Sequence, residues 1–458
     1  MDTSTYVARR KALRGAVSGG AILIMGNNEA PLNYTDNVYP FRQDSNFLYF
    51  VGVSQAGMAA LLEPDGREVL FGAPEGPDDL VWHGPHPTLK DHAVAAGIGD
   101  HDGFAGLGDS LAELRSRGVE IHYLPPYRAE RSFLVGSLLG IDPREVEAGA
   151  SAELVRAVVA RREVKDAAEI AEIEDAVSVT AMGYRAAMAA TEPGRTEAEI
   201  AAYLQGPALA HDRQQAFNPI VSVRGEVLHN TSYANTLAQG DLLLIDSGAE
   251  SRHWYASDIT RTFPVSGSYS QQQRDVYEVV LAAQTNAIAA AAPGVNNRDL
   301  HFIAARTIVS GLKDLGLMQG DVDAAVEAGA HALFFPHGLG HMMGQDVHDM
   351  EDLGDIVGYP EGEERSSQFG LAFLRLAREL APGWVITVEP GIYFIPALID
   401  SWQSEGRHRD FIRYSNIEAF RSFGGVRIED DVLITDDGRR VLGPGIPKTI
   451  GEVEEAMG

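Results

Sequence analysis

The sequence contains no cysteine in its 458 residues. Disulfide bonds and thiolate chemistry are therefore excluded, and with them the disulfide-built scaffolds of many small secreted proteins. Long apolar runs are also missing, because none approaches the ~20 residues that a membrane-spanning helix needs. Gly19 and Gly20 interrupt a short apolar run near the start, so a first helix and a first strand are predicted there rather than a signal peptide. We expect a soluble, cytoplasmic protein.

Basic residues are few relative to acidic ones. The chain has 37 lysines and arginines against 65 aspartates and glutamates, which gives a formal net charge of −28 at pH 7. The acidic residues are spread along the chain instead of being gathered in a tail. Such a surface repels phosphate backbones and anionic lipids, so nucleic-acid and membrane-surface binding are not expected. The same excess of carboxylates can include a site for cations.

At roughly 150 residues per domain, a chain of this length predicts two or three domains. Before residue 150, short strand-like runs are separated by turn residues, with helical patterns between them, which predicts an α/β domain. The predicted strands are residues 21–25, 47–51, 59–62, 69–71 and 121–124, and a helix is predicted for residues 110–117. Turn residues cluster near 142–152, so we place the domain boundary there and expect domains at residues 1–150 and 151–458.

The second part of the chain predicts a different class of fold. Its helical and strand patterns do not alternate strictly, which predicts an α+β domain with a largely antiparallel sheet. The predicted helices are residues 163–190 (one helix or two), 196–205, 271–291 and 299–315, and the predicted strands are 242–246, 259–265, 385–389 and 426–434. No Gly-rich phosphate loop precedes a helix, so nucleotide chemistry is not indicated.

Two aspartates interrupt strands that are otherwise apolar. Asp246 ends the run LLLI, and Asp258 opens the run DITRTFPV, in which period-two alternation places Thr260 and Thr262 on the same face as Asp258. An aspartate before glycine is by itself more often a turn former. The residues between Asp246 and Asp258 can form a hairpin connection, however, so the sequence favours two carboxylates that are brought together.

Two glutamates form a second pair. Glu389 ends the strand VITVE, and Glu429 lies in VRIEDDVLI with Arg427 on the same strand face. An isolated strand glutamate usually points to solvent, but both strands are apolar enough to be central in a sheet. A buried glutamate needs a partner or a metal ion.

Three histidines, His337, His341 and His348, lie between these pairs in the run PHGLGHMMGQDVHD. The glycines among them disfavour an uninterrupted helix and let backbone segments approach closely. A lone histidine is more often structural, whereas three beside glycines favour a functional site.

Four carboxylates and at least one imidazole, with no thiolate, suit hard or borderline ions. Mn²⁺ is the first choice, with Co²⁺, Zn²⁺ and Fe²⁺ as alternatives. Four carboxylates exceed the needs of one ion, whereas bridging carboxylates can hold two ions about 3.5–4 Å apart. Such a pair activates water and polarises the bond that is attacked, so the residues predict a hydrolase.

The ordered motifs DSG, SDITRTFP, PHGLGHMMGQDVHD, TVEPGIY and GGVRIEDD closely resemble the dinuclear metallopeptidases with the pita-bread fold, the family of methionine aminopeptidase, aminopeptidase P and prolidase. The stretch YPFRQDSNFLYFVG resembles the non-catalytic domain that precedes the pita bread in aminopeptidase P and prolidase. The resemblance covers essentially the whole chain. It implies an α+β pita-bread catalytic domain preceded by an α/β amino-terminal domain.

The resemblance implies a set of five metal ligands: Asp246, Asp258, His341, Glu389 and Glu429. Asp258 and Glu429 would bridge the two ions, Asp246 would complete one site, and His341 with Glu389 would complete the other. A bridging hydroxide is the nucleophile in that scheme, and Glu389 would guide its proton.

Further roles follow from the same resemblance. His229 and His348 match the family histidines that stabilise the tetrahedral intermediate and handle the leaving-group proton. Arg427 and Tyr393 would support the ligand carboxylates. His337 is expected to bind substrate.

The resemblance also implies cleavage of Xaa-Pro bonds. A bond to proline has no N–H, so a peptidase that grips this group cannot cleave it. Arg375 matches an arginine with which a prolidase binds the carboxylate of a dipeptide, and a helix-surface arginine is the alternative. The insertion between Glu389 and Glu429 resembles prolidase more than short aminopeptidase P enzymes. We therefore expect a dipeptidase, with aminopeptidase P as the alternative.

Proteins of the resembled architecture commonly pair, so we expect a homodimer or a dimer of dimers. In such dimers the amino-terminal domain of one chain leans over the active site of the other, and Trp82 matches an aromatic residue that closes the pocket. Alternatively, Trp82 fills the core of its own domain. A pita-bread binding module without activity, or a metal-free hydrolase similar to creatinase, is less consistent with the complete ligand set.

Overall fold

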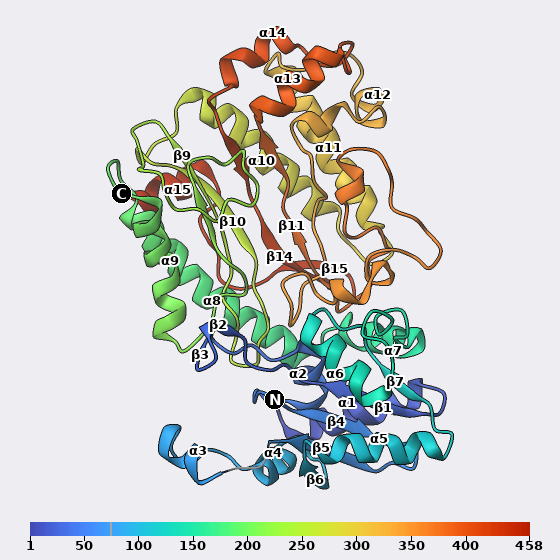
Figure 1. The fold of residues 1–458 in the computed structure, drawn as a ribbon. Coiled ribbons are helices and arrows are strands. Elements are labelled where there is room, and N and C mark those ends of the chain that lie inside the picture. Colours follow the sequence, from blue (N-terminus) through green and yellow to red (C-terminus); the bar gives the residue numbers. More distant parts are fainter. Residues whose placement is uncertain (74–75) are drawn as a thin grey trace. The chain divides into compact units, whose positions relative to one another are not determined.

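The computed structural model describes residues 1–73 and 76–458, which form two compact units (Figure 1). The first unit comprises Met1–Arg162 together with Met350–Gly354, and the second comprises Glu163–Asp349 together with Asp355–Gly458. The chain thus passes between the units three times. The predicted boundary near residue 150 falls before helix α7 (Ala152–Arg162), which the structure includes in the first unit.

The first unit is built on a five-stranded mixed sheet of order β6-β5-β4-β1-β7. Its strands are β1 (Ala21–Met25), β4 (Ala59–Leu62), β5 (Glu68–Gly72), β6 (Asp100–Gly103) and β7 (Ile121–Tyr123). β1 pairs antiparallel with β4 and parallel with β7. The helices are α1 (Thr3–Ala16), α2 (Ser45–Val51), α3 (Pro77–Trp82), α4 (Leu89–Ala96), α5 (Gly106–Ser116) and α6 (Ala129–Leu139), and β2 (Pro31–Tyr34) with β3 (Asn37–Val38) forms a small hairpin. The α/β prediction is confirmed.

One predicted strand of this unit, residues 47–51, is wrong, because these residues belong to helix α2. The Asp44 side chain accepts a hydrogen bond from the backbone N–H of Phe47 and so caps the start of the helix. Gly52, with φ 74°, ends the helix in the left-handed conformation that glycine adopts readily. The run FLYFV is apolar throughout, so its periodicity could not distinguish a buried helix from a buried strand.

The second unit is an α+β fold in which all strand pairs among the described residues are antiparallel, in agreement with the predicted, largely antiparallel sheet. Its strands form sheets of order β10-β9-β8, β11-β14-β15 and β12-β13. Their bounds are β8 (Ile220–Ser222), β9 (Leu242–Ser247), β10 (Ile259–Pro264), β11 (Val385–Val388), β12 (Gly391–Tyr393), β13 (Gly425–Arg427), β14 (Asp430–Thr435) and β15 (Gly438–Val441). The predicted strand 426–434 is therefore interrupted at residues 428 and 429.

Helices flank these sheets. The long helices form two pairs, α8 with α9 and α10 with α11; α8 packs against β10, and α10 against β11 (Figure 1). The helices are α8 (Ala167–Ala190), α9 (Glu197–Ala210), α10 (Gln271–Ala290), α11 (Asn297–Asp314), α12 (Val322–Glu327), α13 (Pro396–Glu405), α14 (Tyr414–Ile417) and α15 (Ile450–Met457). Residues 167–190 form one helix, which begins at a capping box made by Asp166 and Glu169.

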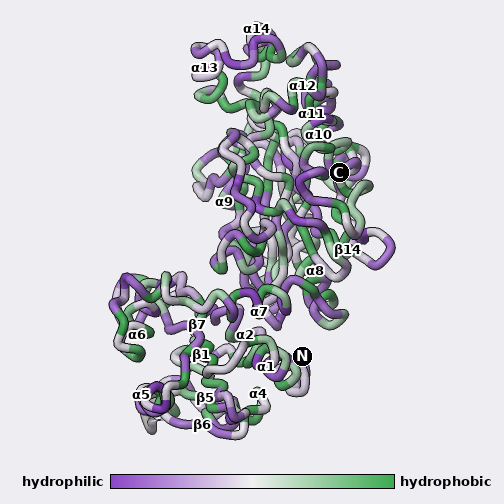
Figure 2. Tube along the Cα trace, turned by 90° about the vertical axis from the view of Figure 1, so that its right-hand side faces the viewer, coloured by the Kyte–Doolittle hydropathy of each residue, from purple (hydrophilic) through white to green (hydrophobic). Residues whose placement is uncertain are grey.

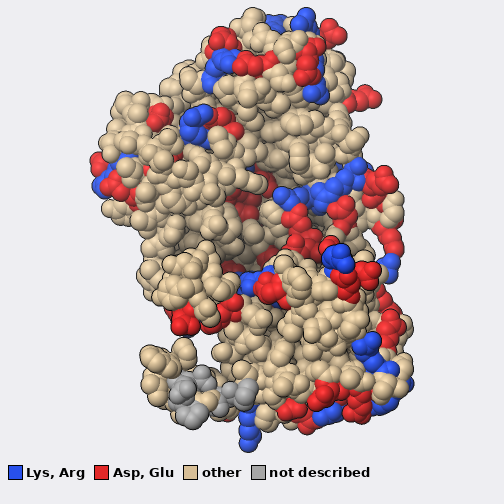
Figure 3. Space-filling model, in the orientation of Figure 1, with Lys and Arg blue, Asp and Glu red and all other residues tan. Residues whose placement is uncertain are grey.

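Hydrophobic and hydrophilic residues alternate along the helices, as expected for elements that bury one face (Figure 2). Acidic and basic side chains are interspersed on the face shown in Figure 3. Among the described helices, none has the length and hydropathy required to cross a membrane.

Two histidines of the second unit, His301 and His331, are completely buried in its core. Their rings lie 5.9 Å apart, and neither ring of this pair has a hydrogen-bond partner for its nitrogens among the described residues. Burial lowers the pKa of His331 from its ordinary value of 6.5 to about 4, and burial together with the His331 charge lowers the pKa of His301 well below its ordinary value. Both imidazoles are therefore neutral in the folded protein near neutral pH.

We expect this pair to make the second unit sensitive to acid. Above pH 6.5 His331 is neutral in both the folded and the unfolded chain, but below it the unfolded chain binds a proton that the folded chain excludes until about pH 4. Stability should therefore fall by about 3 kcal/mol from His331 alone over this interval. His331→Phe should flatten the pH dependence of the unfolding midpoint, followed by fluorescence in a Trp82→Phe background that leaves only the tryptophans of the second unit.

The exposed residue His211 provides the control. His211→Phe should leave the pH dependence unchanged. Equal slopes for His331→Phe and the parent protein between pH 6.5 and 4 would contradict the prediction.

Candidate metal centre

The centre is assembled on strands β9 and β10. In their antiparallel register Asp246 lies opposite Thr260, and Asp258 precedes Thr260 by two residues and so shares its face. On its other side Thr260 forms an isolated β-bridge with Glu429. The Thr260 hydroxyl donates a 2.7 Å hydrogen bond to Glu429 Oε2. The predicted approach of Asp246 and Asp258 is thus produced by the hairpin, with Thr260 as the link to the second pair of carboxylates.

Strand β11 and the segment after β13 supply the glutamates. Val388 pairs with Asp430 in the β11–β14 ladder, which brings the next residue, Glu389, close to Glu429. His341 comes from the glycine-rich loop, where its backbone N–H donates to the hydroxyl of Thr387 on β11. Gly340 is required at this point, because an added Cβ would lie 2.0 Å from the carbonyl oxygen of Thr387.

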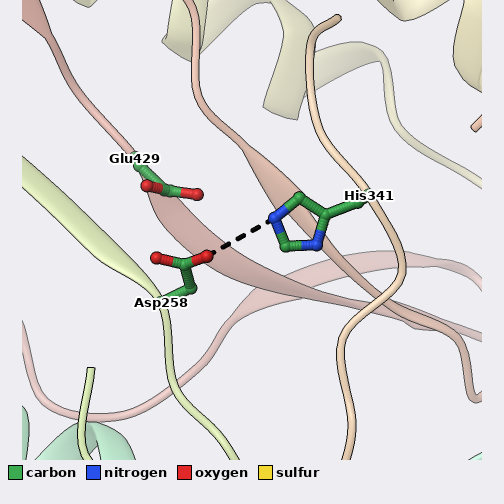
Figure 4. Close-up of side chains that lie close together, drawn as sticks. All are labelled: Asp258, His341 and Glu429. Atoms are coloured by element: carbon green, nitrogen blue, oxygen red, sulfur yellow. Dashed lines mark ion pairs between the residues drawn. The ribbon is translucent and has the colours of Figure 1, made fainter. Parts of the chain in front are cut away.

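Asp258, His341 and Glu429 each place one ligand atom within 4.8 Å of the others, in a fully buried group (Figure 4). His341 Nε2 lies 3.4 Å from Asp258 Oδ2 and 3.8 Å from Glu389 Oε1. The opposite ring nitrogen, Nδ1, lies 3.0 Å from the carbonyl oxygen of Met342, which fixes the ring so that Nε2 faces the carboxylates.

The electrostatics of the group fit a cation. Burial, followed by repulsion from neighbouring carboxylates, raises the pKa of Asp258 and of Glu429 well above the ordinary range. Burial and the charge of Asp246 raise the pKa of Glu389 to about 8, against the opposing charge of Arg427. The Oδ1 atoms of Asp246 and Asp258 are buried and have no hydrogen-bond partner among the described residues. Divalent cations would satisfy these oxygens and offset the repulsion, so the residues present fit a metal centre.

Arg427 supports the carboxylates from behind, together with Tyr393. Its guanidinium donates to Asp246 Oδ2 at 2.6 Å, to the Tyr393 hydroxyl at 2.9 Å and to the Thr260 hydroxyl at 3.1 Å. The Tyr393 hydroxyl also lies 2.9 Å from His337 Nε2. Burial lowers the pKa of His337 to about 3, so its imidazole is neutral. Arg427 and Glu429 both hydrogen-bond the Thr260 hydroxyl and so lie on the same side, although Glu429 lies in the break between β13 and β14 and not on the predicted continuous strand.

A cavity of about 630 Å³ opens onto this group. It brings together the five predicted ligands and most of the other predicted site residues. Those lining it are Asp246, Asp258, His341, Glu389, Glu429, His229, His337, His348, Arg375 and Arg427. The rings of His341 and His348 lie 4.2 Å apart. The helix-surface alternative for Arg375 does not hold, since this residue lines the cavity and lies outside the described helices.

Trp82 lies apart from this set, on helix α3 of the first unit, and its side chain is 79% exposed. The alternative that Trp82 fills the core of its own domain is therefore wrong. The closure of a partner's pocket by this residue stays a prediction.

Sequence reasoning missed part of the cavity wall. Phe217, Phe369 and Phe373 line the cavity, and Phe373 is largely exposed. Phe369 and Phe373 belong to a connection with only one short 3₁₀ turn, whose sequence shows no helical or strand periodicity, so no pattern could assign them to a site. Thr260, which contacts Glu429, could be identified from the sequence, because alternation along its strand places it on the same face as Asp258.

Comparison with known proteins agrees with this geometry. Residues 171–436 match the model of metallopeptidase family M24, and residues 6–122 match the aminopeptidase P N-terminal domain. The chain belongs to metallopeptidase family M24. Its membership confirms the prediction of a metallopeptidase with the resembled two-domain architecture.

Several relatives are similar over nearly their whole length. A probable Xaa-Pro aminopeptidase of Uncinocarpus reesii is 32% identical over 98% of this chain and 92% of its own length, and the Xaa-Pro dipeptidase of Homo sapiens is 33% identical over 96% and 90%. Among solved structures, Pseudomonas aeruginosa aminopeptidase PepP superposes with a TM-score of 0.83 at 30% identity and covers 100% of this chain and 98% of its own. Both kinds of Xaa-Pro peptidase are thus represented among the similar proteins.

Proposed function

We propose that this chain is a dinuclear metal-dependent peptidase that cleaves Xaa-Pro bonds, with dipeptides as preferred substrates. One observation carries the proposal: four carboxylates and an imidazole from separate segments converge at the floor of a cavity that also contains Arg375. The names of the relatives support an Xaa-Pro substrate, and they include dipeptidases and aminopeptidases. Arg375 favours the dipeptidase.

The proposed ligands are Asp246, Asp258, His341, Glu389 and Glu429, which would hold two divalent ions, with Asp258 and Glu429 shared between them. Oxygen-rich ligands and one imidazole favour Mn²⁺, with Co²⁺, Zn²⁺ or Fe²⁺ as substitutes. When bound, such ions lower the pKa of a water molecule and polarise the scissile carbonyl.

The surrounding residues perform the proton transfers. Glu389 lines the cavity among the other proposed ligands and, ionised beside a bound cation, is proposed to accept the proton of the attacking water. His229 and His348 line the same cavity and are proposed to donate hydrogen bonds to the developing oxyanion and to deliver the leaving-group proton. Burial and the Arg427 charge lower the pKa of His229, so it acts as a neutral imidazole near neutral pH.

The residues that line the cavity suit a short peptide that ends in proline. The apolar wall of the cavity, which includes Phe217 and Phe373, can contact the prolyl ring, which has no N–H to satisfy. Arg375 and the neutral His337 are proposed to hold the terminal carboxylate and the adjacent peptide group. A guanidinium binds a carboxylate through two parallel hydrogen bonds, but only when that carboxylate is terminal.

The decisive experiment measures metal content and substrate length together. The purified protein should bind two Mn²⁺ ions per chain, and the loaded protein should cleave an Xaa-Pro dipeptide faster than a matched Xaa-Pro-Xaa tripeptide. Faster tripeptide cleavage would assign the chain to the aminopeptidase P class. Absence of metal and of activity after Mn²⁺ addition would favour the non-catalytic binding module.

Trp82 is proposed to close the pocket of a partner subunit in a homodimer or a dimer of dimers. Its 79% exposure leaves the indole ring available for such a contact. Trp82→Ala should leave metal content unchanged and raise KM for a dipeptide by about fivefold, because an aromatic wall contributes on the order of 1 kcal/mol to binding.

Subunit mixing separates this role from one within the same chain. A heterodimer of Trp82→Ala and Asp258→Asn contains one intact metal site and one intact Trp82 on the opposite chain. It should restore the parental KM at that site, measured at substrate concentrations below KM. No restoration after demonstrated subunit exchange would return Trp82 to its own chain.

A further inference from the structure

Arg261 lies beneath the metal centre, on strand β10, and is buried with 1% of its surface exposed. It is not among the predicted ligands or substrate-binding residues. Its guanidinium donates to five acceptors that come from three separate parts of the second unit. These are the carbonyl oxygens of Thr260 (2.9 Å), Glu429 (2.6 Å), Ile446 (3.1 Å) and Pro447 (3.0 Å), and Asp430 Oδ1 (2.7 Å).

One nitrogen of this guanidinium, Nη1, donates to both Thr260 and Glu429. Glu429 is a proposed bridging ligand, and Thr260 follows the other proposed bridging ligand, Asp258, by two residues on the same strand face. Arg261 therefore joins the backbones that carry the two bridging carboxylates.

This junction has little other support from regular pairing. Strand β10 meets the Glu429 segment through one isolated backbone bridge, that of Thr260 and Glu429, and through side-chain hydrogen bonds of Thr260, Thr262 and Asp431, whereas β9 and β10 share a ladder of six residue pairs. Side chains must therefore set the separation at the bridge. The planar guanidinium, with five donors in a fixed fork, is suited to that task, and a flexible ammonium is not.

The positive charge of Arg261 is balanced by the carboxylate of Asp430. Asp430 Oδ2 accepts hydrogen bonds from Lys448 and, at 3.0 Å, from Gln284 on α10. The Arg261, Asp430 and Lys448 cluster thus ties the bridging strands to α10 and to the segment that precedes α15. It does so without using the oxygens that the metal ions would need.

We propose that Arg261 is a positioning residue that sets the separation of Asp258 and Glu429 and so permits the binding of a second metal ion. The inference rests on the proposed dinuclear function. Arg261→Lys retains the charge but cannot maintain all five hydrogen bonds, so the bridging carboxylates lose their fixed spacing. The first ion, which can be held by fewer ligands, should be affected least.

Manganese titration of the full-length apoprotein tests this proposal, with calorimetry for affinity and electron paramagnetic resonance for the exchange coupling between neighbouring ions. The parent protein should bind two coupled Mn²⁺ ions. Arg261→Lys should bind the first ion within about threefold of the parent and the second at least about 10-fold more weakly, with the coupled signal lost at equal occupancy of the first site.

Arg10→Lys is the matched control. Arg10 is equally buried and donates to the carbonyl oxygens of Phe50, Ala96 and Gly97 and to Glu68, but it lies in the first unit. It should leave both manganese affinities and the coupling unchanged. A comparable loss of the second ion in Arg10→Lys would assign the effect to general destabilisation and overturn the proposal.

If Arg261→Lys does not fold, Asp430→Asn replaces it. This change keeps the Oδ1 acceptor but weakens the hold on Arg261, so a smaller loss of affinity for the second ion is expected. If either variant binds two coupled ions as the parent does, the proposed role of Arg261 is overturned, whereas the proposed dinuclear function is not affected. A parent protein that binds fewer than two ions overturns the proposed dinuclear function as well.

Discussion

Asp258→Asn and Glu429→Gln are each expected to lower kcat/KM for an Xaa-Pro dipeptide by about 1000-fold or more. Each substitution removes a charge that is proposed to bridge two cations, so the ions would bind poorly and repel each other more strongly. A loss of this size corresponds to about 4 kcal/mol of transition-state stabilisation. Steady-state kinetics at saturating Mn²⁺, with metal content measured on the same samples, checks the prediction.

Glu169→Gln is the control for these variants. Glu169 is also buried and accepts a hydrogen bond from the Tyr255 hydroxyl, but it belongs to the capping box of α8 and lies outside the cavity. It should keep near-normal kcat/KM. Near-normal activity in a correctly folded Asp258→Asn protein would count decisively against the dinuclear site.

Arg375→Ala is expected to lower kcat/KM for a dipeptide by about 10- to 150-fold while tripeptide cleavage falls much less. The range corresponds to the loss of charge-assisted hydrogen bonds worth ~1.5–3 kcal/mol. Only a dipeptide presents the proline carboxylate to the guanidinium, so the ratio of the two rates isolates that contact. The ratio is measured at a fixed metal content with substrates that share the residue before proline.

Arg378, three residues after Arg375, provides the control. Arg378 donates to Glu163 and to the carbonyl oxygen of Val357, and it does not line the cavity. Arg378→Ala should leave the dipeptide-to-tripeptide ratio as it is in the parent protein. Equal losses on both substrates in Arg375→Ala would show that Arg375 has a structural role.

The sequence predicted most elements of the second unit because their periodicity is strong and their ends are marked. Helix α10 begins after the capping residue Ser270 within the predicted limits, and β9 and β10 occupy the predicted apolar runs. Residues 47–51 were predicted wrongly because five consecutive apolar residues are compatible with the periodicity of a helix and with that of a strand. There the decisive information lies in the flanking residues Asp44 and Gly52, which cap a helix.

The candidate site was predictable in its chemistry and less so in its surroundings. Asp246, Asp258, Glu389 and Glu429 stand out because each places a charge at or beside an apolar strand. Arg261 stands in the same run as Asp258, but its contacts depend on residues more than 160 positions away in the chain, such as Glu429 and Ile446. Long-range contacts of this kind leave no periodic trace in one sequence.

Phe373 shows the same limit on the substrate side. It lies in a short 3₁₀ segment, Leu371–Phe373, that is positioned by the fold of a long irregular connection. The backbone of this connection lies close to Gly338, where an added Cβ would be 3.0 Å from the carbonyl oxygen of Phe373. The sequence therefore indicates the ions that the site can bind and the bonds that it can cleave. It is less informative about the side chains that surround the substrate.

The five residues Met350–Gly354 make the two units inseparable as genetic modules. They belong to the first unit, although the segments before and after them belong to the second. A gene fragment that encodes residues 163–458 would carry this insert without the partners that the insert has in the first unit. Recombination at the single junction after Arg162 would likewise combine residues Met350–Gly354 with the first unit of a different protein. We therefore expect the two units to be exchanged and inherited together.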